Sequence, residues 1–303
     1  MSLPRSKAAI LERFGDRLQA DRAKHAPDWL VGWHYQQVRA GKYPADYPQD
    51  FTRYEGPADL VRWFNWGRGA PVLNYLPLDR LKPLIEQAEA RDRSVLERLG
   101  IGVEPPVLRA FALLDAQDYL FPRLYPRPER HRLRRVLDFG AGFGRQANLL
   151  LALEPGATYV AMDAIALPYC LQHVYLGALA GGLADYVEEG RFALDDTATG
   201  CHHLPTWRHD LLPDGYFDLA ICSQVLPELS PLLAVFVVEL LRRVLRPGGV
   251  LYIRDHGAVD WNPSGIELAR YLEASGFWLE FRPMLRDRVD LHGLPRIWRK
   301  PEA

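Results

Sequence analysis

The sequence has few cysteines, no excess of positive charge and no long hydrophobic run, and each absence excludes a class of protein. Its three cysteines, Cys170, Cys201 and Cys222, include no Cys-x-x-Cys pair, which excludes a disulfide framework and favours a reducing compartment. The 37 basic and 38 acidic residues give a formal net charge of −1, so no broad basic surface is expected for nucleic acid or anionic lipid. No apolar run approaches the roughly 18 residues of a membrane span. We therefore expect a cytoplasmic protein with no nucleic-acid partner and no membrane partner.

The chain changes character near residue 130. Residues 1–130 hold 13 of the 24 prolines and four of the eight tryptophans, and their clearest helical pattern runs over 81–99. We predict a mainly helical, aromatic-rich N-terminal extension over 1–130 and a second domain over 131–303. The aromatic residues expected to form the core of the extension are Trp29, Trp33, Tyr35, Trp63, Phe64 and Trp66.

The second domain alternates apolar runs with helical patterns, which predicts an α/β fold with a doubly wound, mostly parallel sheet. Strands are expected at 135–138, 158–163, 217–222 and 250–254, with helices that begin near Gly144, Leu167 and Pro231 and a further helix over 264–275. A final pair of strands, at 277–282 and 295–300, is expected to close the sheet as an antiparallel edge hairpin.

The strongest local pattern is the sequence VLDFGAGFGR at residues 136–145. It combines a buried strand, an acidic residue and three alternate glycines, which let the backbone turn sharply and approach a ligand closely. The third glycine comes one residue too early for the G-x-G-x-x-G pattern of dinucleotide sites. The second strand ends in Asp163, where a carboxylate can accept hydrogen bonds from ribose hydroxyls or cap the next helix.

These residues, together with the sequence LRRVLRPGG at 241–249, resemble class I S-adenosylmethionine (SAM)-dependent methyltransferases over residues 131–303. The resemblance implies a seven-stranded Rossmann-like sheet and SAM as the cofactor. It assigns the aminocarboxypropyl end to the glycine loop, the ribose to Asp163 and the adenine amino group to Asp210, or to its neighbour His209. The cofactor-binding residues implied are Asp138, Gly140, Ala141, Gly142, Gly144, Asp163, Ala164, His209, Asp210 and Ser223.

Two further segments, residues 162–176 and 223–230, resemble putative sugar O-methyltransferases more loosely, and they depart from that group at Ile165 and Ala166. In methyltransferases, extensions before the glycine loop often cover the active site or form a dimer face. The extension over 1–130 is therefore expected to be a cap over the substrate or the face of a homodimer. Within it, residues 118–121 lie just before the first strand, and Tyr119 could fold over the cofactor.

A hydroxyl acceptor needs a base, because its pKa lies far above 7. The loops after the fourth and fifth strands supply the candidates Glu228, Asp255 and His256, although Glu228 could instead cap the helix that begins at Pro231. Expected substrate-binding residues are Tyr175, Arg288 and His292. Cys201, His202 and His203 cannot provide four ligands from one tripeptide, so we expect no metal site.

The leading hypothesis is a SAM-dependent O-methyltransferase that acts on a hydroxyl of a small polar molecule, such as a sugar or a biosynthetic intermediate. A second hypothesis keeps SAM but attacks its aminocarboxypropyl chain and releases methylthioadenosine, because motifs report cofactor binding and not the carbon that is attacked. A third is a SAM-binding scaffold without catalysis. A nicotinamide oxidoreductase is disfavoured by the glycine spacing.

Overall fold

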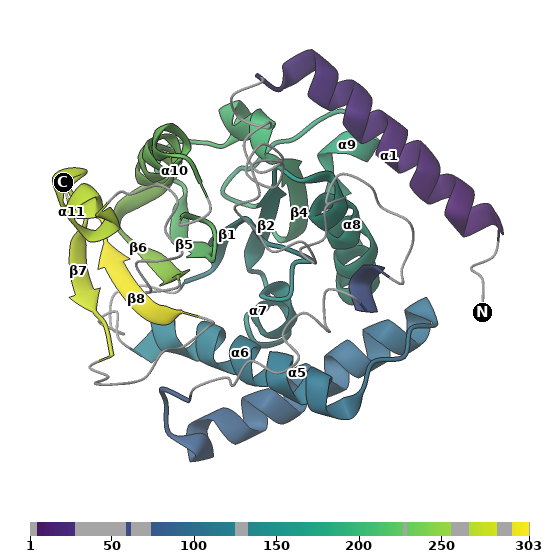
Figure 1. Ribbon diagram of the computed structural model, residues 1–303, viewed down its shortest axis with the longest axis horizontal. Coiled ribbons are helices and arrows are strands. Elements are labelled where there is room, and N and C mark those ends of the chain that lie inside the picture. The colour runs from purple at the N-terminus through teal and green to yellow at the C-terminus, as the bar shows by residue number, and fades with distance from the viewer. Residues whose placement is uncertain are drawn as a thin grey trace.

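The computed structural model describes residues 5–27, 59–61, 74–124, 133–226, 229–255, 267–283 and 293–302. Figure 1 shows these segments as a central sheet with helices on both of its faces. The six aromatic residues expected in the core of the N-terminal extension lie outside the described residues. No helix in the described segments is both long enough and apolar enough to cross a membrane.

The described sheet has eight strands in the order β3-β4-β2-β1-β5-β6-β8-β7. The pairs from β3 to β6 are parallel, and β8 is antiparallel to both β6 and β7. This arrangement confirms the predicted doubly wound, mostly parallel α/β fold. The strands are β1 (Arg135–Phe139), β2 (Thr158–Asp163), β3 (Ala184–Asp185), β4 (Gly200–Pro205), β5 (Phe217–Ser223), β6 (Leu245–Asp255), β7 (Trp278–Phe281) and β8 (Leu294–Arg299).

One detail of the predicted sheet needs correction, and another is confirmed. The predicted number of seven strands is too low by one, because the two-residue strand β3 pairs with β4 and adds an edge. The last two strands form the expected antiparallel pair at the edge of the sheet, where β8 pairs with β6 and β7 is outermost.

Alternate residues of the central strands enter two separate cores. Val136, Tyr159 and Tyr252 belong to one hydrophobic cluster, and their neighbours Leu137 and Val160 belong to the other. Because both faces are covered, these strands read as nearly continuous apolar runs, which is why they could be located from sequence.

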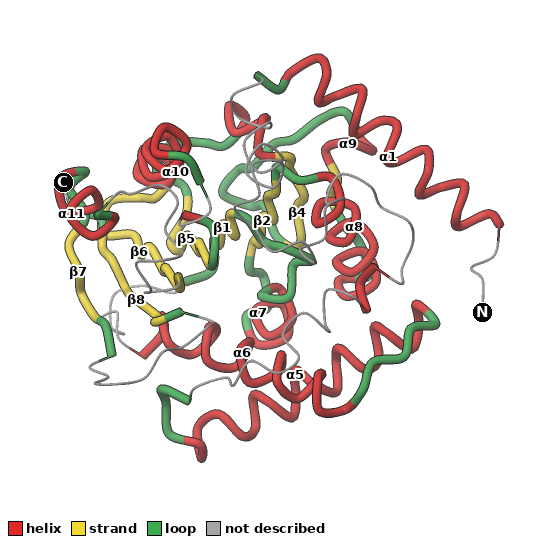
Figure 2. The backbone as a smooth tube through the Cα atoms, viewed as in Figure 1, coloured by secondary structure: helices red, strands yellow, loops and turns green. Residues whose placement is uncertain are grey.

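Helices cover both faces of the sheet (Figure 2). The first core contains residues of α5 (Leu78–Leu99), α6 (Pro105–Leu124), α7 (Ala147–Leu153) and α8 (Ala166–Ala180). The second contains residues of α10 (Pro231–Val244) and α11 (Leu268–Ala274), and α9 (Tyr186–Glu189) and the 3₁₀ helix η1 (Thr206–Leu211) lie near β4. The helix expected over 81–99 is thus confirmed as α5, which ends at Gly100 in the left-handed conformation.

Helix α1 (Arg5–His25) packs over α8 and η1 at the side of the molecule (Figure 1). Phe14 and Leu18 enter a third core with Tyr169 and Trp207. The Phe14 ring stacks on the ring of His173 with centroids 3.9 Å apart. These contacts fix α1 to the sheet domain together with hydrogen bonds that Trp207 and Tyr186 donate to Asp21 of α1.

We predict that Phe14→Ala lowers the free energy of unfolding by about 3 kcal/mol, because it removes a buried ring and leaves a cavity between α1 and α8. Chemical denaturation followed by circular dichroism measures this loss. Gln19→Ala is the control, since Gln19 is exposed on the same helix, and it is expected to change stability by less than about 0.5 kcal/mol. Equal stability of the two variants would show that α1 is not docked through Phe14.

Candidate functional site

The glycine loop connects β1 to α7 by a turn that requires glycine. Gly140, Gly142 and Gly144 all have positive φ angles, of 72°, 60° and 86°. A Cβ atom on Gly140 would lie 2.3 Å from Cγ2 of Val225, so no side chain fits there. The backbone N–H groups of Gly140 and Ala141 donate to the carbonyl oxygen of Met162, which ties the loop to β2. The turn therefore presents bare backbone at the carboxyl edge of the sheet.

Asp163 ends β2 beside this loop. Its Oδ2 accepts from the N–H of Gly142 at 3.3 Å, and its Oδ1 accepts from the N–H of Ile165 at 3.0 Å, just before α8. Burial raises the pKa of Asp163 to about 7, although these backbone N–H groups oppose the shift. The structure thus joins the two predicted cofactor elements, and Asp163 also holds the residues that precede the next helix.

Asp138 lies beneath the loop at the end of β1. It is buried, and its Oδ2 accepts a hydrogen bond of 2.6 Å from the hydroxyl of Tyr159. Burial raises its pKa to about 6, while the Tyr159 hydrogen bond and the positive charge of Arg145 lower it. Direct contact of Asp138 with a cofactor remains a prediction.

One loop contact was missed in the sequence. Nε2 of Gln172, a buried residue of α8, donates to the carbonyl oxygen of Gly142 at 2.8 Å. The available signal was a single amide among the apolar residues that begin α8. Gln172 therefore helps to fix the loop from the helix beside it.

The predicted adenine-binding residues lie in η1, after β4. The Asp210 side chain is 56% exposed and pairs with Arg208, with an N–O distance of 3.1 Å, and the hydrogen bond from Arg208 holds its pKa below the usual value. The His209 ring packs edge-on against Phe236. Their assignment to adenine is untested and stays a prediction, as does that of Ala164, which follows Asp163.

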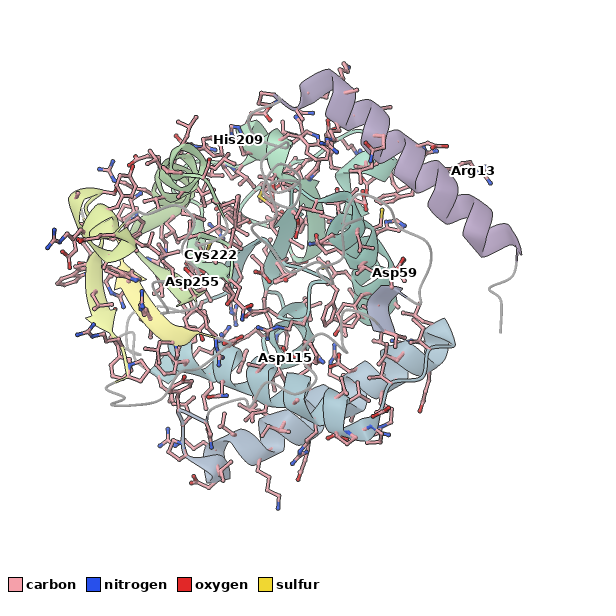
Figure 3. All side chains as sticks on the ribbon, in the orientation of Figure 1. Arg13, Asp59, Asp115, His209, Cys222 and Asp255 are labelled. Carbon is pink, nitrogen blue, oxygen red and sulfur yellow. The ribbon has the colours of Figure 1, made fainter. Side chains whose placement is uncertain are left out.

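Asp255 ends β6 and is the best-defined candidate for a catalytic group (Figure 3). It is 2% exposed, and neither carboxylate oxygen has a hydrogen-bond partner among the described residues. Burial raises its pKa to about 7, against the opposing charge of Arg296 and the nearby N–H groups of Gln224 and Val225. The hydroxyl of Ser223, at the end of the neighbouring strand β5, is also shielded from solvent without a described partner.

Four other predicted residues, Glu228, His256, Arg288 and His292, lie outside the described residues. Tyr175 is described, and its surroundings differ from those expected of a substrate-binding residue. Its side chain is fully buried, and its hydroxyl donates to Asp92 of α5 at 2.5 Å. It therefore contributes to the packing of α8 on α5.

Tyr119 also lies elsewhere than expected. Its hydroxyl donates to Glu154 at 3.0 Å. Glu154 follows the last residue of α7, at the opposite end of that helix from the glycine loop. Tyr119 does not fold over the predicted cofactor site, and its contact holds α6 against the far end of α7.

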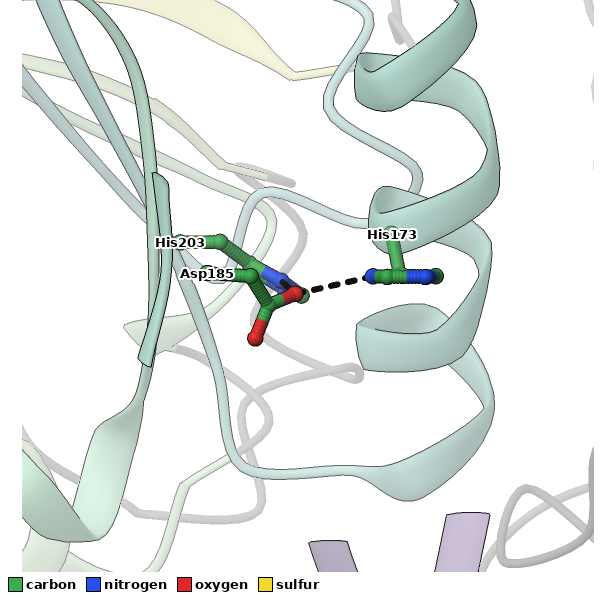
Figure 4. Close-up of side chains that lie close together, drawn as sticks. All are labelled: His173, Asp185 and His203. Atoms are coloured by element: carbon green, nitrogen blue, oxygen red, sulfur yellow. Dashed lines mark hydrogen bonds and ion pairs between the residues drawn. The ribbon is translucent and has the colours of Figure 1, made fainter. Parts of the chain in front are cut away.

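Among the described residues, one group of three side chains has the chemistry of metal ligands (Figure 4). Nδ1 of His173 and Nδ1 of His203 lie 2.9 and 2.8 Å from the same oxygen of Asp185. Its other oxygen accepts from the N–H groups of Val187 and Glu188. Burial alone would raise the pKa of Asp185, but the two histidines hold it below its usual range.

Hydrogen bonds account for this group without a metal ion. Ionised Asp185 can accept from both Nδ1–H groups, and Nε2 of His203 has no partner among the described residues. A metal-bound histidine normally donates its second N–H to an acceptor. We interpret the group as a hydrogen-bonded cluster that fastens α8 to β3 and β4.

The comparisons with known proteins agree with this geometry. A sequence model described as a methyltransferase domain matches residues 108–295. The chain belongs to this methyltransferase family. It is therefore a class I SAM-dependent methyltransferase. That the left-handed glycine loop and Asp163 hold SAM stays a prediction. No curated protein sequence matches the chain.

Solved structures with similar folds include three at low identity. The N-methyltransferase NodS from Bradyrhizobium japonicum, in complex with S-adenosylhomocysteine, is 14% identical, with 71% of this chain and 99% of that chain covered and a TM-score of 0.44. A Burkholderia thailandensis 1,6-didemethyltoxoflavin N1-methyltransferase is 18% identical, with coverage of 76% and 94% and a TM-score of 0.39. The [4+2]-cyclase SpnF is 19% identical, with coverage of 62% and 82% and a TM-score of 0.43.

We predict that Gly140→Ala raises the SAM dissociation constant by at least about tenfold, because the new methyl group displaces Val225 and strains a left-handed backbone. Isothermal titration calorimetry with SAM measures the change. Gly177→Ala in α8 is the matched control, because nothing lies within 4 Å of its added Cβ. The control should bind SAM normally and be slightly more stable. Normal SAM binding by Gly140→Ala would contradict the assignment of the loop.

Proposed function

We propose that this methyltransferase transfers the SAM methyl group to a hydroxyl of a small polar molecule, such as a sugar or a biosynthetic intermediate. The observation that carries the proposal is Asp255, a buried carboxylate with a pKa raised to about 7 at the end of β6. A hydroxyl acceptor must lose its proton as the new bond forms. A carboxylate with a raised pKa is a stronger base than an ordinary aspartate and is still ionised above neutral pH.

The position of Asp255 in the sheet also supports this role. The carboxyl ends of parallel strands lie at one edge, where ligands bind in open α/β sheets. The glycine loop follows β1, Asp163 ends β2, Ser223 ends β5 and Asp255 ends β6. These strands are neighbours in the order β2-β1-β5-β6. A cofactor that spans β2 and β1 would thus be adjacent to an acceptor placed over β5 and β6.

The chemistry divides between cofactor and protein. SAM supplies an electrophilic methyl group on a sulfonium ion. In the proposed reaction the acceptor oxygen attacks the methyl carbon, the bond from that carbon to sulfur breaks, and Asp255 takes the hydroxyl proton. The remaining work of the protein is to align the acceptor and exclude water. Glu228 and His256 remain alternative bases, and Arg288 and His292 remain proposed acceptor contacts.

The first test is product analysis. The purified protein is incubated with SAM alone and with a panel of sugars and small alcohols, and adenosyl products are identified by mass spectrometry. S-adenosylhomocysteine that forms only with an acceptor, together with an acceptor heavier by one methyl group on oxygen, is the expected result. Methylthioadenosine formed without an acceptor would instead indicate attack on the aminocarboxypropyl chain. Binding of SAM without any turnover across the panel would favour a scaffold.

We predict that Asp255→Asn lowers kcat by about 10² to 10⁴-fold, because the acceptor proton loses its base. The wild-type rate should rise with pH through about 7 and then level off, since Asp255 is the active base only when ionised. The Asp255→Asn variant should lose this rise, and its SAM dissociation constant should stay within about threefold of the wild-type value. Steady-state kinetics from pH 5.5 to 9 and calorimetry provide both measurements.

Asp196→Asn is the control for the loss of one carboxylate, because the Asp196 side chain is 90% exposed. It should retain the wild-type kcat and the wild-type pH profile. An Asp255→Asn variant with full kcat would exclude Asp255 as the base and leave Glu228 and His256 as the candidates.

A further inference from the structure

A buried group of charged side chains joins the glycine loop to α6. Arg145 follows Gly144 directly, and its guanidinium faces two carboxylates of α6. Nη1 donates to Oδ1 of Asp115 at 2.5 Å, and Nη2 donates to Oδ2 of Asp118. Asp115 and Asp118 are both almost completely buried, with exposures of 3% and 1%. The loop is therefore held from the helical layer by one guanidinium that donates to two separate carboxylates.

The second oxygen of Asp118 accepts hydrogen bonds from side chains of β6. Oδ1 accepts from Nη1 of Arg254 at 2.8 Å and from the hydroxyl of Tyr252 at 2.6 Å. Arg254 and Tyr252 are also buried. Asp118 thus connects the residue after the glycine loop to two side chains of the strand that ends in Asp255.

Asp118 remains charged although it is buried. Burial would raise its pKa, but Arg254 and Arg145 outweigh that effect and lower the pKa to about 2. For Asp115 the balance is reversed, because burial raises its pKa well above the usual value. Asp118 is therefore the more firmly ionised of the two carboxylates that face Arg145.

We propose that Asp118 is a positioning residue for SAM. In this role it acts through its protein partners, Arg145, Arg254 and Tyr252. It holds Arg145, and through Arg145 the last turn of the glycine loop, in a fixed position relative to β6. This inference rests on membership in the methyltransferase family and is independent of the acceptor and of the base.

Stability alone is a weak explanation for such a cluster. Burying ion pairs costs desolvation energy, and well-packed apolar residues of similar volume are often at least as stabilising. Apolar packing already joins α6 to the loop, since Phe111 packs edge-on against Phe143 with centroids 6.0 Å apart. A charged contact that the loop shares with β6 fixes the position of the loop relative to that strand. Such a position matters, because a displacement of about 1 Å at a reacting group can cost about 100-fold in rate.

The test introduces Asp118→Asn into the full chain. Calorimetry then measures the dissociation constants of SAM and of S-adenosylhomocysteine at a temperature well below the unfolding midpoint. We expect both dissociation constants to rise at least about tenfold. Asp218→Asn is the matched control. Asp218 pairs with Arg246 at 2.6 Å and accepts from two backbone N–H groups beside β1, at the opposite edge of the sheet. It should lower the unfolding midpoint without changing either dissociation constant.

A second variant, Arg145→Gln, tests whether Asp118 acts through Arg145. It also replaces Asp118→Asn as the test if that variant fails to fold. It should also weaken SAM binding at least about tenfold, and the double variant should be little worse than either single variant, because both remove the same contact. Normal SAM affinity in Asp118→Asn overturns the proposal. If Arg145→Gln alone loses affinity, Arg145 acts on SAM directly and Asp118 has no positioning role. None of these outcomes depends on whether the acceptor is a hydroxyl.

Discussion

The close approach of Gly140 to Val225 is the constraint on which the rest of the site depends. No Cβ fits between them, and the glycines at 140, 142 and 144 are all left-handed. The turn can therefore remain narrow, with its N–H groups bonded to β2 and its carbonyl at Gly142 bonded to Gln172. Asp163, Gln172 and the Met162 carbonyl of the predicted cofactor site all bond to this one piece of backbone.

Around that turn, the pKa of each buried carboxylate depends on the balance between burial and the charge of nearby cations. Asp163 and Asp255 are buried without an ion pair at hydrogen-bond distance among the described residues, and burial raises the pKa of each to about 7. Asp118 is equally buried, but two guanidinium groups lower its pKa to about 2. One chemical group thus serves two purposes here. Asp163 and Asp255 can accept a proton near neutral pH, whereas Asp118 stays ionised; Asp115 faces Arg145 alone, and burial still raises its pKa.

The features predicted from sequence are those encoded locally. Strands β1, β2, β5 and β6 are nearly continuous apolar runs, and the glycine loop is a contiguous motif. Strand β4 was missed because its sequence, GCHHLP, places two histidines in a strand, and the buried one, His203, pairs through Nδ1 with Asp185 from another element. Helix α6 was missed because it begins with two prolines and buries three polar side chains, at 115, 117 and 118. Their partners are distant in sequence, so no local pattern reveals them.

The change in composition near residue 130 does not coincide with the start of the matched family region. The matched family region begins at residue 108, inside α6, and so includes both carboxylates that face Arg145. Helices α5 and α6 also share one hydrophobic core with β1, β2 and β6. The backbone of the glycine loop is held from both sides. In this protein β2 and α8 hold it from one side, and the helix that precedes β1 holds it from the other.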